Sequence, residues 1–120
     1  AKVKTVHLYG GETTVKFEVG SAVDLSRGGR NHELGLATLI EIAEGEMVVA
    51  FASDGRDNSD YAGVIVDSSL RDLAKAKKMS PETYLANHDS IGFFQELGTG
   101  QLITGPTGSN VSDLLIAVKF

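Results

Sequence analysis

The sequence contains no cysteine and no tryptophan, and only two of its 120 residues are proline. The absence of cysteine excludes disulfides, iron–sulfur clusters and thiolate zinc sites, and it is compatible with a reducing compartment. No apolar run approaches the ~20 residues of a membrane-spanning helix, and no signal-peptide pattern opens the chain. The net charge of −5 argues against nucleic acid or an anionic membrane as the main partner. We therefore expect a cytoplasmic protein that binds neither.

The patterns that are present predict a single domain over residues 1–120. Two alternating, β-branched segments at 3–9 and 13–19 are joined by a glycine turn, which predicts an N-terminal β-hairpin. Further strands are expected at 47–53, 63–67, 101–104 and 114–120, and helices at 31–44, 68–78, from Ser80 onward and at 89–97. The alternation of strands and helices predicts an α/β fold, a three-layer α/β/α sandwich with a mixed sheet.

The first segment with chemical potential is a glycine pair, Gly28 and Gly29, between Arg27 and Arg30. It leads into the apolar helix, whose first amide groups have no partners within the helix. Glycines let a backbone approach a ligand closely, and arginines favour anions, so the segment suits a phosphate or carboxylate. The alternative is a surface turn with solvated arginines. His32 falls on the apolar side of the helix, where we expect a packed, hydrogen-bonded histidine rather than a general base.

Two further loops carry polar groups. Ser53–Asp60 follows the most apolar strand, and its aspartates Asp54, Asp57 and Asp60 suggest a Mg²⁺ ligand or a proton acceptor; the alternative is a polar turn. Thr104–Asp113 offers donors for an anion, but it lacks the lysine and the spacing of a Walker A motif. A purely structural connection between strands is the alternative there. In Asn87–Ser90 we favour a helix N-cap over a Ser–His–Asp triad.

Taken together, these segments resemble a known family. The matching segments occur in order, as 10–15, 27–33, 53–55, 60–63, 87–94 and 104–113. Over essentially its whole length the chain resembles the MOFRL domain, the C-terminal domain of ATP-dependent glycerate 2-kinases. His32 departs from the family pattern, where glutamine is common, and a usual glycine–proline pair is missing after Asp57.

The resemblance implies a longer enzyme, in which an N-terminal kinase domain precedes this one and binds most of the ATP and Mg²⁺. D-glycerate would be phosphorylated in the cleft between the two domains, and a homodimer is left open. Catalytic roles would fall to Arg30 and Asp54, and the aspartate loop itself makes Asp54 and Asp57 candidate metal ligands. Substrate binding would involve Arg27, Gly28, Gly29, Asn31, Thr107, Gly108 and Asn110. We expect the 120-residue chain alone to phosphorylate nothing, because it has no recognisable nucleotide-binding loop.

Two other functions stay open at this point. The first is a stand-alone, non-catalytic module that binds a small anionic metabolite. The second is a reductase, which the absence of a Gly-x-Gly-x-x-Gly fingerprint disfavours. A reading frame that continues upstream of Ala1 into a kinase domain would distinguish the kinase from the binding module.

Overall fold

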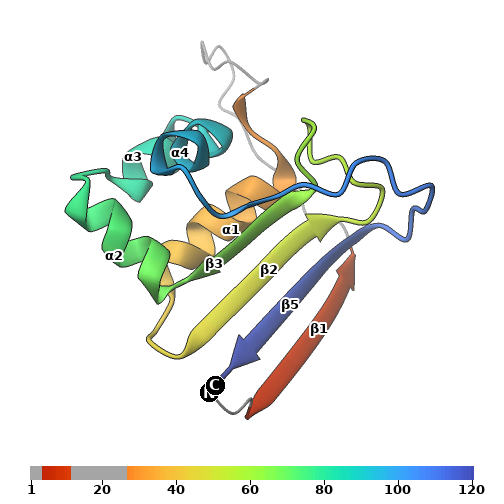
Figure 1. The fold of residues 1–120 in the computed structure, drawn as a ribbon, viewed down its shortest axis with the longest axis horizontal. Coiled ribbons are helices and arrows are strands. Elements are labelled where there is room, and N and C mark those ends of the chain that lie inside the picture. Colours follow the sequence, from red (N-terminus) through yellow and green to blue (C-terminus); the bar gives the residue numbers. More distant parts are fainter. Residues whose placement is uncertain (1–3, 12–26) are drawn as a thin grey trace.

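The structure is a computed structural model that describes residues 4–11 and 27–120. Within these residues the chain forms five strands and four helices (Figure 1). In chain order they are β1 (Thr5–Gly11), α1 (Arg30–Glu41), β2 (Glu46–Ala52), β3 (Gly63–Asp67), α2 (Ser68–Ala76), α3 (Pro81–Ala86), α4 (Ser90–Leu97), β4 (Gln101–Leu102) and β5 (Asp113–Lys119). The α/β class expected from the sequence is confirmed.

The strands form one sheet in the order β1-β5-β2-β3-β4. All four pairings between the described strands are antiparallel, so the expectation of a mixed sheet was wrong for this part of the chain. The reason lies in the connection from β2 to β3, which is a loop without a helix. A parallel pair needs a long crossover, whereas a loop lets consecutive strands pair as antiparallel neighbours.

The described helices lie on one side of the sheet (Figure 1). In this part of the chain the arrangement is therefore two layers, helices over a sheet, rather than the expected three. The predicted hairpin is not tested, because its second strand falls outside the described residues. Its first strand, β1, is at the edge of the sheet and pairs with β5 from Thr5 opposite Lys119 to Gly11 opposite Asp113.

The core lies between α1, α4 and strands β2 and β3. Leu36 and Leu39 of α1 are fully buried, and so are Phe93 and Phe94 of α4, whose rings meet edge to face with centroids 5.2 Å apart. At Gly35 the helix approaches β3 so closely that a Cβ atom would overlap the side chain of Val64. This close packing fixes the first turn of α1 near the ends of the central strands.

The helix ends follow their capping chemistry, with two differences from expectation. Ser80 caps α3 and accepts a hydrogen bond from the Thr83 amide, and α4 ends at Gly98 in a left-handed conformation, as predicted. The cap of α2 is Asp67 rather than Ser68 or Ser69, because the Asp67 carboxylate accepts from the Ser69 and Leu70 amides.

Helix α1 ends at Glu41, three residues earlier than expected. The next residue, Ile42, is extended and turns its side chain into the core. Gly45, expected to cap the helix, instead adopts positive φ in the turn before β2. Among the described helices, none combines the length and the apolar character needed to cross a membrane.

Candidate functional site

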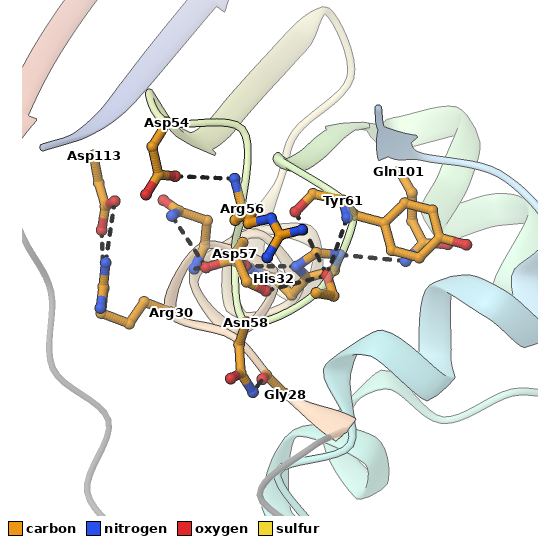
Figure 2. A network of polar contacts seen from close by, with 12 residues as sticks. Gly28, Arg30, His32, Asp54, Arg56, Asp57, Asn58, Tyr61, Gln101 and Asp113 are labelled. Carbon is orange, nitrogen blue, oxygen red and sulfur yellow. Dashed lines mark hydrogen bonds and ion pairs between the residues drawn. The ribbon is translucent and has the colours of Figure 1, made fainter. Parts of the chain in front are cut away.

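Three segments far apart in the sequence meet at one end of the sheet. They are the first turn of α1, the loop after β2 and the residues that lead into β5 (Figure 2). Together they enclose a predominantly polar cavity of about 260 Å³. Its lining residues are Arg30, Ala52, Ser53, Asp54, Asn110, Ser112 and Asp113. The structure therefore brings together Arg30 and Asp54, the two residues expected to be catalytic, and adds Asn110 from the second glycine loop.

Arg30 is held on one wall of this cavity by Asp113. Its Nε donates to Asp113 Oδ2 at 3.0 Å and its Nη2 donates to Asp113 Oδ1 at 3.3 Å, so the contact is bidentate (Figure 2). Asp113 is 8 % exposed and is the first residue of β5, opposite Ala52 of β2. A two-pronged contact fixes the plane of a guanidinium as well as its position. The ion pair thus orients Arg30 while leaving its side chain partly exposed.

Asp54 lies on the loop that follows β2, and its side chain is exposed. The loop turns on itself, because Asp54 Oδ1 accepts from the Arg56 amide at 2.9 Å. Gly55 has a φ of +91°, and a Cβ atom there would overlap the carbonyl of Gly105. The loop after β2 therefore packs directly against the second glycine loop at a position that only glycine tolerates. This contact sets the place of the Asp54 carboxylate.

The N-terminus of α1 already has an anion, and it is the protein's own. Gly29 is the N-cap and supplies no side chain, so the Asp57 carboxylate takes that role from a loop 26 residues away. Asp57 Oδ1 accepts from the Asn31 amide and side chain at 3.0 and 3.2 Å, and Asp57 Oδ2 accepts from the His32 amide at 2.7 Å. A Cβ atom on Gly29 would overlap Asp57, which explains the need for glycine there.

His32 completes this buried cluster. It is fully buried, and its Nδ1 lies 2.5 Å from Asp57 Oδ2. Donation from Nδ1 leaves Nε2 to accept from the side-chain amide of Gln101 at 3.3 Å. The expectation of a packed, hydrogen-bonded histidine is confirmed.

The same contacts determine the acidity of Asp57. Burial by itself raises the pKa of the carboxyl, but hydrogen bonds from His32 and from the Asn31 and His32 amides outweigh it. The net effect lowers the pKa of Asp57 below its ordinary value. The group is therefore an ionised cap on α1.

Several residues that were expected to bind substrate or metal form contacts within the protein and lie outside the cavity. Asn31 and Asp57 are buried and form a hydrogen bond with each other inside the protein. Arg27 forms an ion pair with Asp89 at 2.6 Å, and Gly28 accepts from the Asn58 side chain. None of these four lines the cavity. In the described part of the chain no group of three carboxylate or imidazole side chains is arranged to hold a metal ion.

Of the three residues of the second glycine loop that were expected to bind substrate, one lines the cavity. Thr107 Oγ1 donates to the Ser53 carbonyl at 2.5 Å and so ties the two loops together. Gly108 is exposed and has positive φ, and neither residue lines the cavity. Asn110 does line it, and Asn110 Oδ1 accepts from the Ser112 amide at 3.1 Å.

At Asn87–Ser90 the structure favours a helix start over a triad. Asp89 occupies the N-cap of α4, although its side chain pairs with Arg27 rather than with the helix amides. His88 pairs through Nδ1 with Glu33 of α1 at 2.9 Å. These contacts join α1 to the start of α4 and are structural.

Asp113 is the residue that sequence reasoning missed. It lay within the matching segment 104–113, but nothing in the sequence placed it beside Arg30, 83 residues away. The signal that finds it is the pairing of β5 with β2, which puts Asp113 next to the loop that carries Asp54.

Comparison with known proteins identifies the family of this chain. Residues 5–113 match the MOFRL family. The D-glycerate 2-kinase of Thermotoga maritima is 41 % identical over 114 residues, covering 92 % of this chain and 26 % of the relative. The glycerate 2-kinase of Pyrococcus horikoshii is 38 % identical over 115 residues, covering 94 % of this chain and 25 % of the relative.

The fold is similar to a solved structure as well. The crystal structure of glycerate kinase from T. maritima superposes with a TM-score of 0.83 at 40 % identity, covering 96 % of this chain and 27 % of that one. The chain thus spans about a quarter of the length of these relatives. Since the family match extends over nearly the whole sequence, the chain belongs to the MOFRL family.

Proposed function

We propose that this chain acts as the C-terminal domain of an ATP-dependent glycerate kinase and contributes Arg30 and Asp54 to an active site shared with another domain. The observation that carries the proposal is the cavity itself. Phosphoryl transfer needs a positioned arginine and an exposed carboxylate. Arg30 and Asp54 supply these groups and line the same polar cavity. The family relatives that contain this domain are named glycerate kinases.

Arg30 is suited to charge neutralisation. A transferring phosphoryl group carries its negative charge on oxygens that protein donors can stabilise, and most of the catalysis is positioning and electrostatics. Asp113 holds Arg30 through Nε and Nη2, so the guanidinium keeps one orientation at the cavity wall. An oriented arginine loses less entropy when it engages the phosphoryl oxygens.

Asp54 is suited to the acceptor side of the reaction. A carboxylate in this position can orient the attacking hydroxyl of D-glycerate and accept its proton. It can equally serve as one Mg²⁺ ligand, since Mg²⁺ in kinases is held by one or two carboxylates together with phosphate oxygens and water. The cavity fits one such ligand, because its other carboxylate, Asp113, is engaged by Arg30.

ATP and Mg²⁺ supply the phosphoryl group and neutralise its charge when they are bound. The sequence of this chain contains no phosphate-binding glycine loop of the Walker type, so we assign the nucleotide mainly to the preceding domain. The rival reading, a stand-alone module that binds a small anion at the α1 N-terminus, is disfavoured because Asp57 fills that position.

The test is a coupled assay of ATP consumption that depends on D-glycerate and Mg²⁺. We expect turnover by the full-length polypeptide and none by the 120-residue chain. In the full-length polypeptide, Asp54→Asn should lower kcat by about 10²-fold or more, as for loss of a general base. The matched control is Asp60→Asn on the same loop, whose exposed side chain does not line the cavity. Equal turnover for Asp54→Asn and wild type would contradict the role of Asp54.

A further inference from the structure

The two faces of the sheet differ sharply. On the side toward the helices, Val48 and Ala50 of β2 and Val64 and Val66 of β3 are buried in the core. We call the opposite side the outer face. Residues directly opposite in antiparallel strands point to the same side, so the register identifies the members of the outer face. On β1, β2, β3 and β5 they are two glycines, Gly10 and Gly63, one charged residue, Asp67, and nine apolar residues, Val6, Leu8, Met47, Val49, Phe51, Ile65, Leu114, Ile116 and Val118.

One row of this face runs across four strands. Leu8 of β1 lies opposite Ile116 of β5, Ile116 lies opposite Val49 of β2, and Val49 lies opposite Ile65 of β3. Every side chain in the row is large and apolar, and on these four strands the one charged outer-face residue is Asp67, at the end of β3, where it caps α2. Antiparallel sheets with one solvated face normally alternate apolar and polar residues. This composition is that of a face covered by protein.

The outer face is nevertheless open to solvent in the part of the chain that the structure describes. The described helices all lie on the other side (Figure 1). Leu8 is 67 % exposed, Val6 57 % and Ile65 37 %. Exposed apolar area costs about 25 cal/mol per Å² relative to burial, and large contiguous apolar patches on soluble proteins mark interaction surfaces.

The length of the relatives shows how much further chain a longer polypeptide could bring to this face. The fold similarity to the T. maritima glycerate kinase includes 96 % of this chain but only 27 % of that one, so about three quarters of the relative lies outside the shared region. The outer face spans three side-chain rows over four strands, roughly 15 Å in each direction. One or two helices, each about 10 Å wide, would cover it.

We propose that the outer face docks a helical layer from the remainder of the longer polypeptide, which completes the sandwich on that side. The proposal rests on the proposed function only in placing this chain within a longer polypeptide. It concerns a different surface from the candidate site: no residue of the outer face lines the Arg30 cavity. Docking on the outer face and catalysis at the Arg30 cavity can therefore be tested separately.

The absence of cysteine from this chain provides a direct test. Single cysteines are introduced as Ile65→Cys on the outer face and as Leu73→Cys on α2, and their reaction rates with a maleimide are followed by peptide mass mapping. The two positions are matched, since Ile65 is 37 % and Leu73 is 38 % exposed. In the 120-residue chain we expect comparable rates. In the full-length polypeptide, Ile65→Cys should react at least about tenfold more slowly, as expected when labelling requires local opening, while Leu73→Cys keeps its rate.

Three outcomes would overturn the proposal. Ile65→Cys could react equally fast in both proteins, which would mean that the longer polypeptide leaves the face open. It could be equally slow in both, which would mean that the face is covered within this chain. Protection that appears in the 120-residue chain and grows with its concentration would assign the face to a second copy instead. If Ile65→Cys fails to fold, Leu8→Cys on the same row serves as reporter. None of these readouts depends on kinase activity.

Discussion

Two aspartates contact the first turn of α1 from different sides, and they differ in what surrounds them. Asp57 is buried, accepts hydrogen bonds from Asn31 and His32, and closes the N-terminus of the helix. Asp113 sits at the wall of a polar cavity and engages Arg30, whose side chain remains partly exposed. Asp57 is thus an anion that stabilises the fold, whereas Asp113 is an anion that orients the Arg30 guanidinium for a ligand.

The largest effect expected from this comparison is on stability. Asp57→Ala removes the cap and leaves the donors of Asn31 and His32 buried without an acceptor. Breaking one side of such a buried cluster typically costs about 3–5 kcal/mol. Urea denaturation should show this loss in the free energy of unfolding, with no measurable change for the exposed control Asp60→Ala. A loss as small as that of Asp60→Ala would mean that the cap is not what holds α1 in place.

A smaller effect is expected on the pH dependence of stability. The lowered pKa of Asp57 means that the unfolded chain, with an ordinary aspartate pKa of about 3.9, binds the proton more readily in acid. The stabilisation is therefore present above about pH 4 and is lost as the pH falls through the folded-state pKa. Carbon-13 NMR titration of the Asp57 carboxyl in the wild-type chain checks this directly. A midpoint above that of an exposed aspartate would contradict the prediction.

The smallest effect on stability is expected for Asp113→Asn. Because the Arg30 side chain is 41 % exposed, solvent screens the ion pair, and we expect a loss of about 1 kcal/mol or less. Turnover of the full-length polypeptide should fall nonetheless, because Arg30 loses its bidentate anchor. Thermal unfolding and kcat are measured together, and Asp113→Glu should recover part of kcat. A large stability loss with unchanged kcat would make Asp113 a second structural anion like Asp57.

The sequence predicted local features better than long-range ones. The Ser80 cap, the end of α4 at Gly98 and the packed state of His32 followed from side-chain chemistry and periodicity over a few residues. Strand directions did not, because they depend on which distant segments pair. The same limit applied to the site. The α1 N-terminus and its arginines predicted an external anion, yet the residue that fills this position, Asp57, comes from the loop after β2.

The sequence also predicted some residues of the site better than others. Arg30 and Asp54 were selected from their positions at a helix start and after a central strand, and both line the cavity. Asp57, on the same loop, was expected to be a second metal ligand beside Asp54, since both are aspartates in one polar turn. Burial separates them: Asp57 is 3 % exposed, whereas the Asp54 side chain is open to solvent.

The most direct test of the central claim is the turnover of Arg30→Ala in the full-length polypeptide, measured with D-glycerate, ATP and Mg²⁺ and paired with its thermal unfolding midpoint. If Arg30 neutralises the transferring phosphoryl group, kcat should fall by ~10³ or more while the unfolding midpoint stays nearly unchanged. Arg30→Lys should also be poor, because lysine keeps the charge but not the planar fork that Asp113 holds. Wild-type turnover together with a lowered unfolding midpoint would contradict the account and make Arg30 a structural residue at the start of α1.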